Sequence, residues 1–142
     1  MNVKEVMSGR PITVSPEESA AVAARLLSRH NIGALPVCSK NGSLKGMITD
    51  RDIVLRCIAA DEDPQTTKVS EIMTRRVFSV DAGDSVESAT SLMAKEQIRR
   101  LPVQEKGKIV GMLSLGDLAC RSGSSDKAGQ ALSNISSNIK NP

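Results

Sequence analysis

Two short motifs carry residue types suited to binding a nucleotide. Thr49 stands three residues before Asp52, and Ser114 stands three residues before Asp117. Where a strand runs into a helix, backbone N–H groups favour a phosphate, and a Thr or Ser hydroxyl can add a donor. An aspartate in the first helical turn can accept hydrogen bonds from both hydroxyls of a ribose. The same spacing is also an acidic form of the capping box, in which these side chains serve only the helix.

Both motifs belong to a longer pattern that occurs twice in the chain. The repeated pairs are Val3–Met7 with Val69–Met73 and Ile32–Val37 with Ile98–Val103, both 66 residues apart, and Gly46–Asp52 with Gly111–Asp117, 65 residues apart. A repeat at a fixed period indicates that one copy cannot bury its apolar face alone. We therefore expect the functional surface where the two copies meet.

The pattern within each copy predicts a strand, a helix, two strands and a second helix. The strands are expected at Pro11–Val14, Ala34–Cys38 and Leu44–Thr49, and at Val77–Val80, Arg100–Gln104 and Lys108–Ser114. Asn41-Gly42 and Lys106-Gly107 are suited to hairpin turns. Apolar residues at helical spacing predict a helix between the first two strands of each copy, and Ser15-Pro16-Glu17-Glu18 is the expected start of the earlier one. The second helices are expected from about Asp50 to Ile58 and from about Leu115 to Ala119.

Composition excludes several classes of function. The 142 residues are 39% hydrophobic and 25% charged, which is typical of a soluble globular protein. No apolar run is long enough to cross a bilayer and the N-terminus does not have the pattern of a signal peptide, so we expect a cytoplasmic protein that does not bind membranes. A net charge of +3 and a single aromatic residue, Phe78, argue against a nucleic-acid partner.

Catalytic and metal-binding chemistry are also not predicted. The three cysteines are far apart in the sequence, and the single histidine, His30, has no thiol nearby in the sequence. No nucleophile, base and orienting group can be assembled by their usual roles. We predict no catalytic residue, no metal ligand and no required cofactor, and we expect that the protein is not an enzyme.

The repeated segments resemble a tandem pair of CBS domains, the cystathionine β-synthase-type regulatory module, in its stand-alone two-repeat form. The resemblance covers Val3 to about Ala119 and rests on the two openings, on Leu35-Pro36-Val37 and Leu101-Pro102-Val103, and on the two seven-residue segments that end in Asp52 and Asp117. It implies an α/β fold of α+β type, with two β-α-β-β-α repeats packed as a pseudo-twofold module. It also implies two clefts between the repeats, which in many members bind AMP, ADP, ATP, NAD or S-adenosylmethionine.

The resemblance assigns roles to particular residues of this chain. The ribose position falls on Asp52 and Asp117, and the hydroxyl on the phosphate side falls on Thr49 and Ser114. The complete set of predicted ligand-binding residues is Thr13, Val14, Gly33, Ala34, Pro36, Thr49, Arg51, Asp52, Ser79, Val80, Arg99, Arg100, Pro102, Ser114 and Asp117. Arg99 and Arg100 stand where the first copy has Gly33 and Ala34, so we expect unequal clefts, although the two arginines can also be a solvated strand edge.

We expect repeat 1 at residues 1–60, a linker at 61–68, repeat 2 at 69–121, and at 122–142 either a polar tail or a short docking helix. The predicted function is regulatory: the module binds an adenosyl nucleotide and signals through an unknown protein target or a change of oligomeric state. The alternative is a ligand-free dimeric scaffold of the same fold. The apolar segment Ile53–Ile58 and the resemblance both favour a homodimer.

Overall fold

The computed structural model describes residues 1–121, which form two compact units. The continuous unit is Ile12–Val77. The discontinuous unit combines Met1–Pro11 with the described residues from Phe78 onward. The units therefore do not coincide with the sequence repeats, because the opening segment of each repeat belongs to the unit formed by the rest of the other repeat. The predicted tail or docking helix at 122–142 lies outside the described residues.

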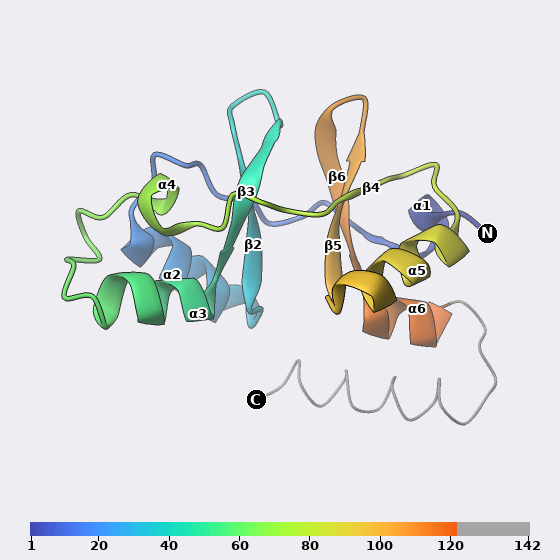
Figure 1. Cartoon of the computed structure of the whole chain (residues 1–142). Helices are drawn as coiled ribbons and strands as arrows, with labels where there is room; N and C mark the ends of the chain where they lie inside the picture. Colours follow the sequence, from blue (N-terminus) through green and yellow to red (C-terminus); the bar gives the residue numbers. More distant parts are fainter. Residues whose placement is uncertain (122–142) are drawn as a thin grey trace. The chain divides into compact units, whose positions relative to one another are not determined.

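The continuous unit is built on an antiparallel hairpin of β2 (Ala34–Cys38) and β3 (Leu44–Thr49). The helices α2 (Ala20–His30) and α3 (Asp50–Ile53) pack with this hairpin, and α3 continues as the π-helix η1 (Val54–Ile58) (Figure 1). The short helix α4 (Val69–Ile72) completes the same core. Fully buried Leu35, Val37 and Ile48 form the centre of that core. The predicted order of strand, helix, strand, strand, helix is confirmed, with the first strand reduced to a single bridge between Val14 and Val37.

The discontinuous unit contains a four-stranded sheet in the order β1-β6-β5-β4. Its elements are α1 (Val3–Val6), β1 (Ser8–Gly9), β4 (Val80–Asp81), α5 (Val86–Glu96), β5 (Arg100–Glu105), β6 (Lys108–Ser114) and α6 (Leu115–Arg121). Strand β4 runs parallel to β5, whereas β1 and β5 both run antiparallel to β6. The predicted hairpin turn at Lys106-Gly107 is confirmed, since both residues have positive φ, as a two-residue turn of type I′ requires. Residues of α1 and α5 share one core with Leu101, Val103 and Leu113.

Helix α2 begins later than the sequence pattern predicted. Ser19 caps α2 by accepting a hydrogen bond from the N–H of Val22, and Ser85 caps α5 in the same way. The prediction that Ser15 starts the helix was wrong, because Ser15 instead closes a separate turn through the N–H of Glu18. That turn holds the start of α4, since the Glu18 carbonyl accepts a hydrogen bond from the N–H of Val69.

The glycine that opens each seven-residue segment allows a second strand to approach closely. A Cβ on Gly46 would lie 2.6 Å from the carbonyl oxygen of Thr74, and a Cβ on Gly111 would lie 2.7 Å from that of Ser8. Both distances are shorter than van der Waals contact. The repeated glycine therefore lets the residues that follow α4 and α1 pair with β3 and β6 respectively.

The segment 61–68 is mostly exposed, but it is anchored to α2. Thr67 is buried, and its carbonyl oxygen accepts a hydrogen bond from the N–H of Ala20 at 2.8 Å. Among residues 1–121, no helix has both the length and the apolar character needed to span a bilayer.

Candidate functional site

The two hydroxyl–aspartate motifs form capping boxes at the ends of β3 and β6. The Asp52 N–H donates to Thr49 Oγ1 at 2.9 Å, and the Thr49 N–H donates back to Asp52 Oδ2 at 3.0 Å. In the other unit, the Asp117 N–H donates to Ser114 Oγ at 2.9 Å and the Ser114 N–H donates to Asp117 Oδ2 at 3.1 Å. The capping interpretation is thus confirmed at both strand–helix junctions, where β3 leads into α3 and β6 leads into α6.

Capping does not use all the hydrogen-bonding capacity of these side chains. Each hydroxyl oxygen accepts one bond and keeps its own hydrogen, which can still be donated. A carboxylate can accept about four hydrogen bonds, and each box uses only one. Asp52 and Asp117 are buried, at 7% and 8% exposed, and the backbone N–H groups of Thr49 and Ser114 fix the positions of their carboxylates. The junctions can therefore cap a helix and still bind a diol.

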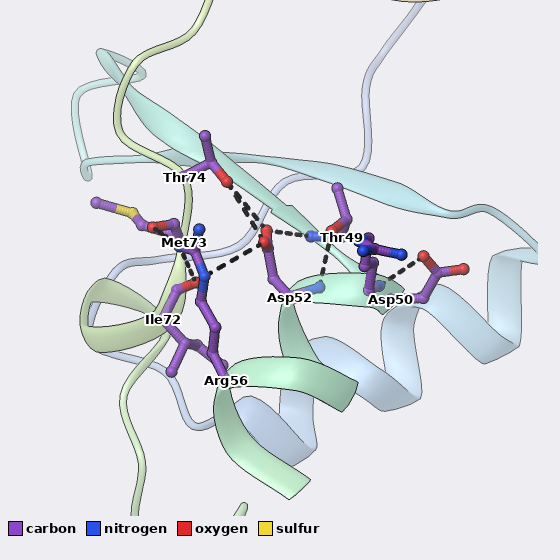
Figure 2. A network of polar contacts seen from close by, with 8 residues as sticks. Thr49, Asp50, Asp52, Arg56, Ile72, Met73 and Thr74 are labelled. Carbon is purple, nitrogen blue, oxygen red and sulfur yellow. Dashed lines mark hydrogen bonds and ion pairs between the residues drawn. The ribbon is translucent and has the colours of Figure 1, made fainter. Parts of the chain in front are cut away.

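Asp52 has further partners that Asp117 does not have among the contacts described for residues 1–121. The Thr74 hydroxyl lies 3.4 Å from both carboxylate oxygens of Asp52. Arg56, one helical turn later, places its Nε 3.9 Å from Oδ1. Figure 2 shows these groups converging on the carboxylate, with Thr49 on the opposite side from Arg56. The two junctions therefore share a backbone design and differ in the surroundings of the acid.

The predicted residues before the Leu-Pro-Val strands lie beside the junctions. In the continuous unit, Ala34 pairs with Thr49 in register and the Gly33 carbonyl accepts from the N–H of Asp50 at 3.1 Å. In the discontinuous unit, Arg100 pairs with Ser114, and the Arg99 carbonyl accepts from the N–H of Leu115 at 2.8 Å.

The two arginines therefore lie next to the junction of their own unit. Arg99 is exposed and Arg100 is half-buried.

The predicted residues of the early strands lie on the other edge of β2 and β5. Val14 is bonded to β2 through the carbonyl of Pro36, and Val80 pairs with Val103 of β5. Ser79 accepts a hydrogen bond from Gln104 Nε2 at 2.8 Å, whereas Thr13 is exposed. Pro36 and Pro102 are fully buried within β2 and β5. Arg51 is exposed in the first turn of α3.

Sequence reasoning did not identify Thr74 or Arg56 as neighbours of Asp52. Arg56 follows Asp52 by four residues, which is the spacing of an ion pair on one helix face, so it could have been found. Thr74 had a weaker signal: it follows the repeated opening at the position where the first copy has Ser8. Its contact with Asp52 depends on the pairing of residue 74 with Met47, which local pattern does not encode.

The cysteines provide no metal site in the described structure. Cys38 and Cys57 are buried and Cys120 is exposed. Burial raises the pKa of the Cys38 thiol. No group of three or more His, Cys, Asp or Glu side chains within residues 1–121 is placed to hold a metal ion.

Comparison with known proteins agrees with the duplicated architecture. The CBS domain family model matches the chain twice, at residues 3–58 and 69–122. The chain belongs to the CBS domain family. It is 47% identical over 135 residues to the CBS domain-containing protein YhcV of Bacillus subtilis, and the match covers 95% of each chain. The sequence-based recognition and the α/β fold class are confirmed.

Two solved structures are similar to this chain in fold and sequence. A crystal structure of Hypoxic Response Protein I with two coordinated zinc ions has a TM-score of 0.79 and 34% identity, covering 85% of this chain and 98% of that one. The CBS domain pair of protein MJ0100, in complex with 5′-methylthioadenosine and S-adenosylmethionine, has a TM-score of 0.75 and 31% identity, covering 89% and 98%.

Proposed function

We propose that this CBS protein is a regulatory module that binds an adenosyl nucleotide. The ribose hydroxyls donate to the carboxylate of Asp117 or Asp52, and the hydroxyl of Ser114 or Thr49 donates to the phosphate or to the group that replaces it. The observation that carries this proposal is the repeated junction, at which a capped and nearly buried carboxylate keeps unused acceptor capacity. The MJ0100 domain pair, which holds adenosyl ligands, supports the same ligand class.

The surroundings of the two junctions favour different ligands. Arg99 and Arg100 can add charge-assisted hydrogen bonds to a polyphosphate, whereas Gly33 and Ala34 offer only backbone atoms and close approach. We therefore propose that ATP and ADP are bound with the help of the arginines, and that the Thr49–Asp52 junction takes a weakly charged adenosyl compound. The ion-pair contribution is screened by salt, so ATP binding weakens as ionic strength rises.

Calorimetric titration with AMP, ADP, ATP, NAD and S-adenosylmethionine tests the proposal. Loss of a charged acceptor for ribose hydroxyls removes about 1.5–3 kcal/mol, so Asp117→Ala or Asp52→Ala should weaken binding at least tenfold. Arg99→Ala combined with Arg100→Ala should weaken ATP binding while leaving adenosine binding unchanged. If the wild-type protein binds none of these compounds at millimolar concentration, the ligand proposal is wrong.

An exposed apolar surface on η1 supports the proposal that the protein forms a homodimer. Val54, Leu55 and Ile58 are 54%, 49% and 55% exposed, and they are the large apolar residues of one short helix. The equivalent positions of α6 that the structure describes carry the smaller Ala119 and Cys120. Such a cluster is typical of a surface that is covered by a partner, and a second copy arranged symmetrically supplies the same apolar surface.

The signal of a regulatory module has to reach another molecule. We propose that ligand occupancy acts through a protein target or through the homodimer, and that the protein has no catalytic activity of its own. The ligand-free scaffold is the second candidate, and the same η1 surface favours it. The titration separates the two, since a scaffold dimerises but does not bind the adenosyl compounds.

A further inference from the structure

Arg56 connects η1 to the segment that follows α4. Its Nη1 donates to the carbonyl oxygens of Ile72 at 3.2 Å and Met73 at 3.3 Å. These carbonyls lie at the C-terminal end of α4, where acceptors have no partner within the helix and a positive charge is favourable. The guanidinium therefore fixes the end of α4 against the helix that carries Asp52.

The same guanidinium faces the Asp52 carboxylate, at 3.9 Å from Nε to Oδ1. The segment that it fixes also reaches Asp52, because the Thr74 hydroxyl lies 3.4 Å from both carboxylate oxygens. Two backbone hydrogen bonds with Met47, at 2.8 and 2.9 Å, hold Thr74 against β3. Figure 2 shows Arg56 reaching the carbonyls of residues 72 and 73 and the carboxylate of Asp52.

We propose that Arg56 is a positioning residue for the ligand site of the continuous unit: it ties the Asp52 carboxylate to the segment Ile72–Thr74, so that both keep one arrangement. The proposal rests on the function proposed above, because it assumes that Asp52 receives the ribose. Oδ2 already accepts the N–H of Thr49 at 3.0 Å, so Oδ1, the oxygen that faces Arg56, has the larger remaining capacity for a diol.

Amide hydrogen exchange of the protein without ligand tests whether Arg56 holds the segment Ile72–Thr74 in place. Arg56→Met keeps much of the aliphatic stem and removes every donor. We expect the amide of Thr74 to exchange about five- to tenfold faster in this variant, while the amide of Ile48 in the core is unchanged. The matched control is Arg25→Met, which alters an exposed arginine on α2 of the same unit. Unchanged exchange at Thr74 in Arg56→Met overturns the proposal.

Asp52→Asn shows whether the carboxylate takes part in this coupling. Asparagine still accepts the capping hydrogen bond but loses the charge that faces Arg56. The double variant combines Asp52→Asn with Arg56→Met. If the two residues act as one unit, the Thr74 amide of the double variant exchanges no faster than in Arg56→Met alone. Exchange factors that multiply in the double variant contradict the link between Arg56 and Asp52.

The positioning part is tested with S-adenosylmethionine and AMP as calorimetric probes. We expect Arg56→Met to weaken binding at the Asp52 site about three- to tenfold, and Arg56→Lys, which restores the charge, to recover part of the loss. A purely structural role predicts a lower melting temperature with unchanged affinity, and that result overturns the positioning role. If the wild-type protein binds neither probe, Asp52 has no ligand to position and the positioning role falls with the proposed function. The exchange experiment still decides whether Arg56 couples Asp52 to Thr74.

Discussion

Removal of the two junction carboxylates should destabilise the protein to different degrees. Asp117→Ala removes the acceptor of the Ser114 N–H, and loss of a capping side chain costs about 0.5–2 kcal/mol. Asp52→Ala removes the same cap and also the contacts with Thr74 and Arg56. Those contacts are long, at 3.4 and 3.9 Å, and the Arg56 side chain is 53% exposed, so together they add about 1 kcal/mol or less. We expect losses of about 0.5–2 kcal/mol for Asp117→Ala and about 0.5–3 kcal/mol for Asp52→Ala, with Asp52→Ala the more damaging by up to about 1 kcal/mol.

Urea denaturation followed by circular dichroism measures both losses, and Asp50→Ala provides the control. Asp50 lies in the same first turn as Asp52 but is exposed, and its described side-chain hydrogen bond is to the neighbouring N–H of Arg51. Its removal should cost about 0.3–1 kcal/mol through the helix dipole. If Asp50→Ala is as damaging as Asp52→Ala, the stability depends on charge at the helix start and the capping argument is refuted. If Asp117→Ala is the more damaging of the two, the role given to Thr74 and Arg56 is wrong.

Three further predictions follow from packing and burial. Gly46→Ala should destabilise the protein by about 2 kcal/mol or more in urea, because the new methyl group overlaps a backbone carbonyl, whereas Gly9→Ala, with no atom within 4 Å, should be nearly neutral in packing. Burial raises the pKa of Cys38, so the folded state favours the protonated thiol; this contribution to stability is present below about pH 8.5 and is lost as pH rises through the raised folded pKa. A thiol reagent at pH 8 should modify the exposed Cys120 before the buried Cys38, and equal rates of modification would contradict the burial of Cys38. Leu55→Lys should shift the protein from dimer to monomer in light scattering at tens of micromolar, and a wild-type protein that is already monomeric there would rule out the homodimer.

Much of the fold was predictable because it is encoded locally. The hairpin turns, the apolar spacing of α2 and α5 and the polar residues at the strand–helix junctions are all visible within short windows of sequence. Repetition added information that neither copy carries alone, since Thr49–Asp52 and Ser114–Asp117 follow equivalent strands. The start of α2 was predicted too early, because Ser15 and Ser19 both look like caps and only tertiary hydrogen bonds to α4 distinguish them.

The surroundings of the candidate site could be predicted only in part. Gly33, Ala34, Arg99 and Arg100 were expected near the junctions, and antiparallel pairing places them there. Thr74 could not be placed, because it reaches Asp52 through a strand contact between residues 27 positions apart in the chain.

The opening segment of each repeat belongs to the unit formed by the rest of the other repeat, and this has a consequence for folding during synthesis. All of Ile12–Val77 leaves the ribosome as one stretch, so the continuous unit can fold while the rest is still being synthesised. Residues 1–11 leave first, yet their partners β5 and β6 are not available until about a hundred residues have been added. A fragment cut at the boundary between the sequence repeats, near residue 60, would keep α1 and β1 without their sheet and lose α4 from the other core. The fragment 12–77 is therefore the one to express when half of this protein is wanted on its own.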